Sequence, residues 1–281
     1  MRGRQPDGRL VVMYAITLHS FGGPEVMEWE EVPTVQAGPG EIRIRTIAAG
    51  VNRADLLQRR GLYPPPPGAS EIPGLEATGV VDQVGEGVTR WRVGDQVACL
   101  LGGGGYAEYA VVPARQAMPL PSGIDPVTSA GMIEAACTVL SNFDRVHLSA
   151  GETVLIHGGA GGIGSFAIQY ADALGCRVLT TAGTDDKLAY CRDLGADQAF
   201  NYHGDWAANV MIATSDRGVD VILDVVGAAY LESNVSCLAQ DGRLVVIGTQ
   251  KGNRGTLDLG LLLRKCSHGS LIAGRLSLAG G

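Results

Sequence analysis

The stretch LIHGGAGGIG, residues 155–164, places five glycines and one alanine in the seven positions after His157. Gly159, Gly161 and Gly164 match the spacing G-x-G-x-x-G. A turn of this kind between a strand and a helix lets a pyrophosphate approach the backbone N–H groups at the positive end of the helix. Glycine accounts for 41 of the 281 residues, so a turn that is merely tight is the alternative. Its position directly after the apolar run TVLIH favours a dinucleotide site.

The glycine turn opens a series in which strands and helices alternate. We expect strands at 153–157, 177–182, 197–201, 220–224, 243–247 and 270–273. Helix-length segments such as 166–174 and 187–194 separate them. Strands joined by crossover helices are parallel, so this half of the chain is predicted to be a doubly wound α/β domain. As edge strands, 243–247 and 270–273 would be available to pair across a homodimer.

The half of the chain before residue 121 has a different pattern. Short apolar runs divided by glycine and proline alternate with charges, as in EIRIRTIAA (41–49), which predicts a mostly β, barrel-like domain. One helix interrupts it, with Asn52 as N-cap, Asp55 in the first turn and Gly61 as the stop. The four prolines from Pro64 to Pro67 then predict a stiff loop.

Composition excludes several classes of protein. The formal charge of −7 argues against a nucleic-acid-binding surface, which draws affinity from Lys and Arg. No uncharged apolar run approaches a membrane span. The six cysteines form no C-x-x-C pair, which favours a reduced, cytoplasmic compartment. Residues 1–12 are expected to be a disordered extension, with a short organellar address as the alternative because of the three arginines.

The end of the second strand of the α/β series predicts which dinucleotide binds. Enzymes that use NAD usually place Asp or Glu there to hold the ribose hydroxyls. This chain has Thr181, Ala182, Gly183 and Thr184, which are small and neutral, so we expect NADPH. Lys187 would pair with the 2′-phosphate. The alternative is that Thr184 caps a helix and that Lys187 is only solvated; the two interpretations are compatible.

These motifs resemble a known family. GETVLIHGGAGGIGSFAIQ (151–169) is similar to the signature of the zinc-independent quinone oxidoreductases, or zeta-crystallin-like proteins, of the medium-chain dehydrogenase/reductase superfamily. The segments 51–79, 101–110 and 199–202 resemble its tumour-suppressor-inducible NADPH quinone oxidoreductase branch. The resemblance implies a GroES-like substrate domain over 1–126 and a Rossmann domain over 127–281. It implies NADPH-dependent reduction of quinones or related conjugated carbonyls, by hydride or one-electron transfer.

The resemblance also implies residue roles. Tyr63 would lie beside the nicotinamide, and Asn52 and Asp55 would be polar groups of the same cleft. The expected cofactor contacts are Gly159, Ala160, Gly161, Gly162, Ile163, Gly164, Gly183, Thr184, Lys187, Tyr202, Gly227, Gly248 and Thr138. An enoyl-thioester or enone reductase, and an NADPH-binding protein without activity, are the alternative functions.

Two departures bear on activity. Zinc enzymes of the superfamily need a Gly-His-Glu segment and a lobe of clustered cysteines, whereas this chain has Leu75 at the histidine position and no such lobe, so no metal is expected. Family members also continue into a segment that returns to the substrate domain. We therefore expect the C-terminal return segment to be missing here and full activity to be in question.

Overall fold

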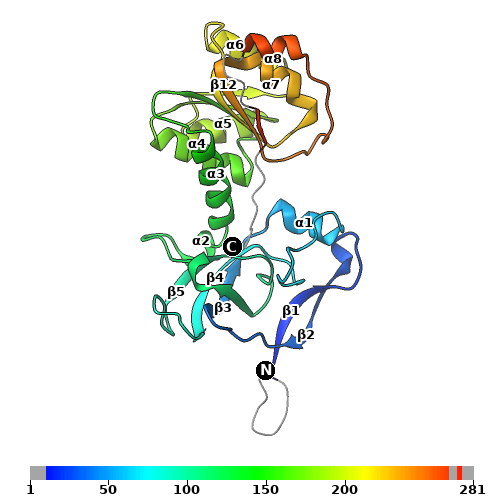
Figure 1. Ribbon diagram of the computed structural model, residues 1–281, viewed down its shortest axis with the longest axis vertical. Coiled ribbons are helices and arrows are strands. Elements are labelled where there is room, and N and C mark those ends of the chain that lie inside the picture. Colours follow the sequence, from blue (N-terminus) through cyan, green and yellow to red (C-terminus); the bar gives the residue numbers. More distant parts are fainter. Residues whose placement is uncertain (1–10, 266–270, 274–281) are drawn as a thin grey trace. The chain divides into compact units, whose positions relative to one another are not determined.

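A computed structural model describes residues 11–265 and 271–273. The chain divides into two compact units, with the division between Glu134 and Ala135 inside helix α3 (Ile133–Arg145), and each unit is described by itself (Figure 1). In the described part of the chain, no helix has both the length and the apolar character that a membrane crossing requires. The expected extension at 1–12 lies almost wholly outside the described residues, and strand β1 begins at Val12.

The first unit is built mainly from antiparallel strands, as its alternating pattern predicts. A hairpin of β1 and β2 stands beside a five-stranded sheet of order β6-β3-β4-β5-β7. The Ala15–Ala107 bridge joins the hairpin to the segment before β6. The strands are β1 (Val12–Leu18), β2 (Met27–Pro33), β3 (Glu41–Ala49), β4 (Glu76–Val84), β5 (Gln96–Leu100), β6 (Tyr109–Pro113) and β7 (Ala117–Pro119). The short helices are η1 (Pro24–Val26), α1 (Arg53–Arg59), η2 (Ala114–Gln116) and α2 (Pro126–Ser129).

Alternation along β3 determines which face of this sheet is buried. Ile42 and Ile44 are fully buried, whereas Arg43 lies on the opposite face and pairs with Asp82 at 2.8 Å. Because side chains of a strand alternate between faces, the apolar set of β3 meets that of its neighbours in one core. The predicted helix is also present: Asn52 is its N-cap, and Gly61, at φ +73°, follows its C-cap Arg60.

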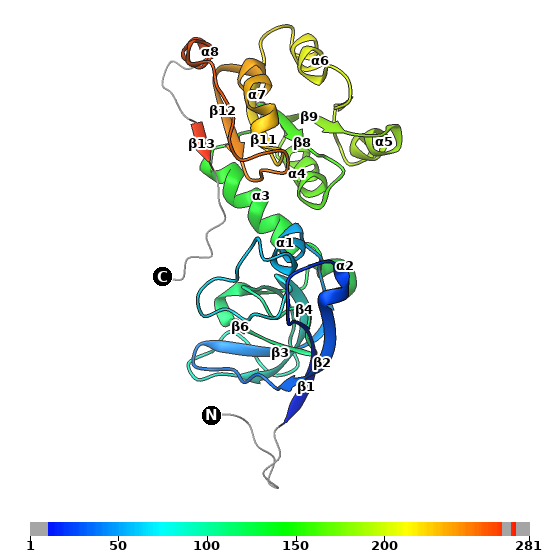
Figure 2. The same ribbon diagram turned by 90° about the vertical axis from the view of Figure 1, so that its right-hand side faces the viewer.

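The second unit is a six-stranded parallel sheet of order β10-β9-β8-β11-β12-β13 (Figure 2). Its strands are β8 (Thr153–His157), β9 (Arg177–Ala182), β10 (Gln198–Asn201), β11 (Val219–Asp224), β12 (Leu238–Val246) and β13 (Leu271–Ala273). Its helices are α4 (Gly162–Ala173), α5 (Asp185–Asp193), α6 (Trp206–Ala213), η3 (Ala228–Tyr230), α7 (Leu231–Cys237) and α8 (Leu259–Lys265). The order reverses direction at β8, which is the doubly wound arrangement of dinucleotide-binding folds.

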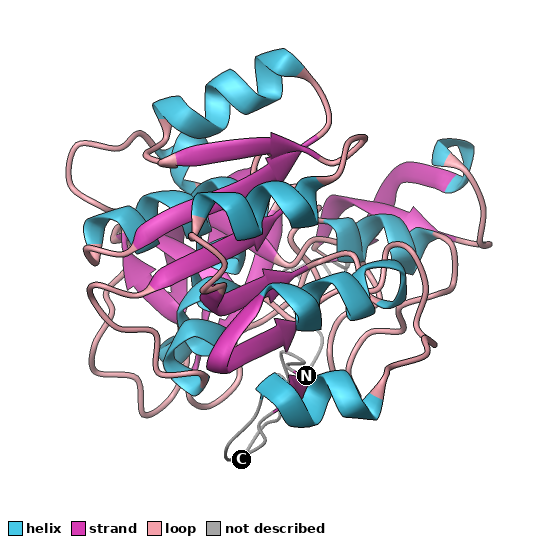
Figure 3. Ribbon diagram, turned by 90° about the horizontal axis from the view of Figure 1, so that it is seen from above, coloured by secondary structure: helices cyan, strands magenta, loops and turns pink. Residues whose placement is uncertain are grey.

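Helices cover both faces of this sheet (Figure 3). Val154 and Ile156 of β8 pack with α3, α4 and α5 on one face, while Leu155 packs with Trp206 and Val210 of α6 on the other. All five residues of β8 are buried. A central parallel strand needs apolar side chains on both faces, which explains the continuous apolar run before the glycine turn.

The predicted α/β pattern is confirmed, with one correction. The bounds of β8 and β9 agree with the expectation, those of β10 and β11 differ from it by one residue, and β12 begins at Leu238, five residues before the expected 243. However, β12 lies between β11 and β13 and is not an edge strand, so 243–247 is not available to pair across a dimer. Its late position in the sequence suggests an edge of the sheet, but its second edge pairs with β13.

Candidate functional site

The glycine turn connects β8 to α4 at the carboxyl end of the sheet. A Cβ on Gly164 would overlap the carbonyl oxygen of Gly158 and lie 2.6 Å from Cα of Gly159. A Cβ on Gly159 would overlap Oγ1 of Thr180 and lie 2.9 Å from Sγ of Cys191. These two glycines are therefore required by the packing of the turn against strand and helix.

Gly161 and Gly162 of the turn are less crowded than Gly159 and Gly164. A Cβ on Gly162 would meet nothing within 4 Å, and one on Gly161 would approach only the Gly158 carbonyl, at 3.3 Å. Packing therefore does not explain the lack of a side chain at Gly162. The N–H groups of Gly162 and Ile163 have no acceptor among the described residues, as is usual in the first turn of a helix. Together with the positive end of the α4 dipole, these groups fit the diphosphate of a dinucleotide.

The end of β9 lies against this turn. Gly159 donates its backbone N–H to the carbonyl of Thr181 at 3.0 Å, so the two predicted parts of the cofactor site are neighbours. A Cβ on Gly183 would lie 2.5 Å from Cζ of Tyr202, so the absence of a side chain at Gly183 admits the tyrosine ring. Ala160 is half-buried beside this edge. No carboxylate occupies the end of β9, in agreement with the reading of Thr181 to Thr184.

Helix α5 starts as the capping interpretation predicts. The hydroxyl of Thr184 accepts the backbone N–H of Lys187 at 3.4 Å, and Asp185 and Asp186 stand in the first turn. The side chain of Lys187 is exposed. The cap uses only the backbone of Lys187, so its ammonium group stays available for an anion. The cap is confirmed, and the role of Lys187 toward a 2′-phosphate, which is compatible with it, stays a prediction.

Two further predicted glycines join the loops after β11 and β12. Gly227 has φ +85°, and a Cβ there would lie 2.6 Å from the carbonyl oxygen of Gly252. A Cβ on Gly248 would lie 2.7 Å from the carbonyl oxygen of Val225. The two loops can therefore pack backbone against backbone beside β8, where the strand order reverses. Open sheets of this kind bind ligands outside the carboxyl ends of their strands at this point.

A buried polar network under the turn was not foreseen in the sequence. His157, 1% exposed, lies 3.0 Å from Oγ1 of Thr181 through Nδ1 and 2.7 Å from Oδ1 of Asn234 through Nε2. Asn234 donates to Asp224 at 3.0 Å, and Asp224 also accepts the N–H groups of Val226 and Gly227. Burial lowers the pKa of His157 to about 4 and raises that of Asp224. The network ties the ends of β8, β9 and β11 to α7.

Thr138, the remaining predicted cofactor residue, lies in α3. It is buried, and its carbonyl accepts the side-chain amide of Asn142 at 2.7 Å. This contact belongs to the helix itself. The role of Thr138 toward a cofactor stays a prediction.

In the first unit, Asn52 and Asp55 belong to a network of buried carboxylates. Asp55, 4% exposed, accepts the N–H of Asn52 at 2.7 Å, the hydroxyl of Tyr106 at 2.9 Å and the N–H of Gly74 at 3.1 Å. Glu76, 2% exposed, accepts the side-chain amide of Asn52 at 2.8 Å and the N–H of Glu134 at 3.0 Å. Asn52 therefore links the two acids. Glu76 and Tyr106 were not identified from the sequence, because nothing local distinguishes them from other sheet residues.

Burial controls the protonation of this network. Loss of solvent raises the pKa of Asp55 and of Glu76, and the hydrogen bonds that each accepts oppose that rise. The pKa of Tyr106 is strongly raised by its burial and by the neighbouring Asp55 carboxylate. Tyr106 therefore acts as a hydrogen-bond donor at any physiological pH. Both oxygens of Asp55 are occupied by donors, which is the pattern of a positioning residue.

Tyr63 lies in the loop before the four prolines. Its ring is half-buried, and its hydroxyl has no hydrogen-bond partner among the described residues. In the described part of the chain, no hydrogen bond joins it to Asn52 or Asp55. Its phenol thus differs from that of Tyr106, because it is not held by a buried carboxylate.

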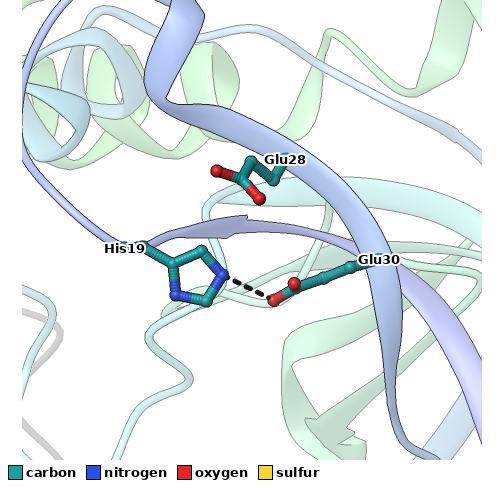
Figure 4. Close-up of side chains that lie close together, drawn as sticks. All are labelled: His19, Glu28 and Glu30. Carbon is teal, nitrogen blue, oxygen red and sulfur yellow. Dashed lines mark ion pairs between the residues drawn. The ribbon is translucent and has the colours of Figure 1, made fainter.

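The described residues do not fit a buried zinc site. Leu75, 6% exposed, offers no ligand beside Glu76. Across the described residues, one group of three potential ligands lies close together, namely His19, Glu28 and Glu30 around the β1–β2 hairpin (Figure 4). There Nε2 of His19 pairs with Glu30 at 2.9 Å, and Thr17 donates to the same carboxylate at 2.6 Å. This is a solvent-exposed ion pair, and the expectation of a zinc-free protein stays a prediction.

Comparison with known proteins agrees with this geometry. The model of the alcohol dehydrogenase GroES-like domain matches residues 38–122, and that of the zinc-binding dehydrogenases matches 162–277. A quinone oxidoreductase of Pseudomonas aeruginosa is 37% identical over 266 residues, which cover 94% of this chain and 81% of the relative. The chain belongs to the quinone oxidoreductase family of the medium-chain dehydrogenases/reductases.

Two further similar proteins are a reductase with a different named substrate and a solved structure with a nucleotide. A 2-haloacrylate reductase from a Burkholderia species is 35% identical, over 86% of this chain and 74% of the relative. The crystal structure of Escherichia coli quinone oxidoreductase complexed with NADPH has a TM-score of 0.81 and 32% identity, and the match covers 94% of this chain and 81% of that chain. The family resemblance read from the motifs is confirmed, as is the combination of a GroES-like and a Rossmann domain.

Proposed function

We propose that this protein catalyses the NADPH-dependent, zinc-independent reduction of quinones or related conjugated carbonyls. The observation that carries the proposal is the turn at Gly162, whose missing side chain packing does not require. The neutral end of β9 and the exposed Lys187 beside it supply the preference for NADPH. The E. coli relative of similar fold is complexed with NADPH, which supports the same cofactor here.

The residues of the second unit would divide the cofactor between them. The segment from Gly159 to Gly164, which includes Ala160, would border the diphosphate, and the free N–H groups of Gly162 and Ile163 would hold it. Gly183, Thr184, Lys187 and Tyr202 would surround the adenosine 2′-phosphate. Gly227, Gly248 and Thr138 would border the nicotinamide half.

Bound NADPH supplies a hydride, so the protein contributes position and proton supply. The hydroxyl of Tyr63 has no hydrogen-bond partner among the described residues and is suited to donate a proton or a hydrogen bond to a carbonyl oxygen. Asn52 and Asp55 would shape the same cleft, with Asp55 held in place by Tyr106 and Gly74. Quinones need little acid assistance, because the electron-poor ring accepts a hydride or one electron readily.

The preference for NADPH is tested at Lys187. We expect Lys187→Ala to weaken NADPH binding by about 1.5–3 kcal/mol, the range for hydrogen bonds to charged groups, and to leave NADH binding nearly unchanged. Arg192→Ala, in the last turn of the same helix, is the matched control and should alter neither. Equal losses for both nucleotides in a fluorescence titration would remove this role from Lys187.

The reaction is tested by NADPH oxidation with ortho-quinones, para-quinones and enones. Similarity to the 2-haloacrylate reductase favours including 2-haloacrylates, which are conjugated carboxylates. Turnover of crotonyl thioesters but not of quinones would select an enoyl-thioester reductase. Binding of NADPH without any turnover would identify a non-enzymatic protein.

Tyr63→Phe tests whether Tyr63 acts as a proton donor or only as a packing residue. If its hydroxyl supplies the proton, turnover of enones should fall at least about tenfold, while quinones, which need less acid assistance, should be less affected. Unchanged turnover with every acceptor would leave Tyr63 as a packing residue. Tyr190→Phe, an exposed tyrosine of α5, is the control.

Assembly and location complete the proposal. We propose a homodimer in the cytoplasm. β13 is the last strand of its sheet in the described part of the chain and supports pairing of edges between two copies, and the described cysteines form no disulfide. Light scattering after size-exclusion chromatography tests the first point, and fractionation of cells tests the second. A monomeric mass, or recovery of the protein in another compartment, would contradict them.

A further inference from the structure

The loop after β12 carries a lysine that the predicted site does not include. Nζ of Lys251 lies 5.4 Å from the ring centroid of Tyr202 and 6.0 Å from that of Tyr230. These tyrosines follow two different strands, β10 and β11. Lys251 therefore brings a positive charge from a third loop to the carboxyl edge where Gly183 and Tyr202 meet.

The backbone around Lys251 is held in place by hydrogen bonds. Lys251 donates its N–H to the carbonyl of Val226 at 2.8 Å, and Ala228 donates to the carbonyl of Gly252 at 2.9 Å. Gly252 adopts φ +110° and closes the turn. The position of the lysine thus follows from the packing of two loops, and its flexible side chain reaches out from a fixed base.

The charge of Lys251 is not neutralised within the described residues. Its side chain is exposed, and no carboxylate lies within ion-pair distance of it there. Contact with the faces of two aromatic rings stabilises an ammonium group but leaves its N–H donors unused. Asp224, the nearby buried acid, accepts backbone and Asn234 donors instead.

We propose that Lys251 is a second cation for the 2′-phosphate of NADPH, in addition to Lys187. This inference rests on the proposed function. The ring of Tyr202 lies against Gly183, and Thr184 and Lys187 begin the helix that follows. A phosphate seated beside Gly183 would have one lysine from α5 and one from the loop after β12. The two charges would explain how a protein with a net charge of −7 holds a dianionic group.

The test compares ligands that differ by that phosphate. Dissociation constants of 2′,5′-ADP, 5′-AMP, NADPH and NADH are measured for the wild type and for Lys251→Met, which keeps the aliphatic stem and removes the charge. We expect about a tenfold loss for 2′,5′-ADP and NADPH, and less than a twofold change for 5′-AMP and NADH. Lys251→Arg should restore most of the affinity. Arg254→Met, in the same exposed segment, is the matched control and should leave all four constants unchanged.

The outcomes separate this proposal from the proposed function. The wild type is expected to bind 2′,5′-ADP more tightly than 5′-AMP, and NADPH more tightly than NADH. If Lys251→Met shows the same preferences as the wild type, Lys251 has no role at the phosphate. Equal losses for phosphorylated and unphosphorylated ligands would also overturn the proposal, because they indicate a general effect on the site. If the wild type binds neither 2′,5′-ADP nor NADPH, the proposed function fails and this inference fails with it.

Discussion

The buried His157 makes the stability of the second unit depend on pH in a defined window. Its ring is 1% exposed, and burial holds its pKa at about 4, compared with 6.5 in an unfolded chain. Between pH 6.5 and pH 4, His157 is therefore protonated in the unfolded chain but neutral in the folded one. Stability from this group is complete above pH 6.5, falls as the pH decreases, and stops falling near pH 4. At about 1.4 kcal/mol per pH unit over about 2.5 units, the full loss amounts to about 3.5 kcal/mol.

The measurement needs a variant that cannot titrate and a signal from the second unit. His157→Gln retains a donor and an acceptor without a group that ionises. The ring of Trp206 lies 4.7 Å from that of His157 and reports on this core, so Trp29 and Trp91 of the first unit are replaced by Phe in both proteins. Urea unfolding is followed by tryptophan fluorescence at several pH values from 7.5 to 4.5.

Other titrating groups are common to both proteins and cancel in the difference. We expect the stability of the wild type relative to His157→Gln to fall by about 2–3 kcal/mol between pH 7 and pH 4.5. A difference that stays constant within about 0.5 kcal/mol over this range would refute the reasoning, because it would mean that His157 takes up its proton in the folded protein as readily as in the unfolded chain.

Three further changes have expected outcomes. Gly164→Ala should destabilise the second unit by about 3 kcal/mol, because its Cβ would strike backbone atoms. Gly162→Ala should leave the melting temperature nearly unchanged and still weaken NADPH binding. Similar melting temperatures for the two variants would contradict this reasoning. Thr184→Ala should lower the free energy of unfolding in urea by about 0.5–1 kcal/mol through loss of the cap. An unchanged free energy would show that the 3.4 Å contact does not stabilise the helix. Tyr106→Phe should cost about 1–3 kcal/mol in the first unit by removing a donor from the buried Asp55, and a calorimetric transition at the wild-type temperature would contradict it.

Local patterns were enough to predict most of the fold. The apolar run before the glycine turn, the neutral end of β9 and the caps at Asn52 and Thr184 all depend on residues within a few positions of one another. Hydrophobic periodicity and capping act over this short range, and so they are readable from one sequence. The spacing of the motif predicts close packing at Gly164, but only the folded structure shows that Gly162 has open space around it.

The amino-acid sequence by itself determined the order of strands and helices, the dinucleotide turn and the absence of an acid at the end of β9. Only the tertiary structure decided that Asn234 meets His157 across 77 positions, that Tyr106 holds Asp55 across 51, and that Lys251 reaches Tyr202. It also decided that β12 is an interior strand. Such contacts depend on how strands pair and loops pack, and no periodicity within a short window records which distant residues burial will bring together.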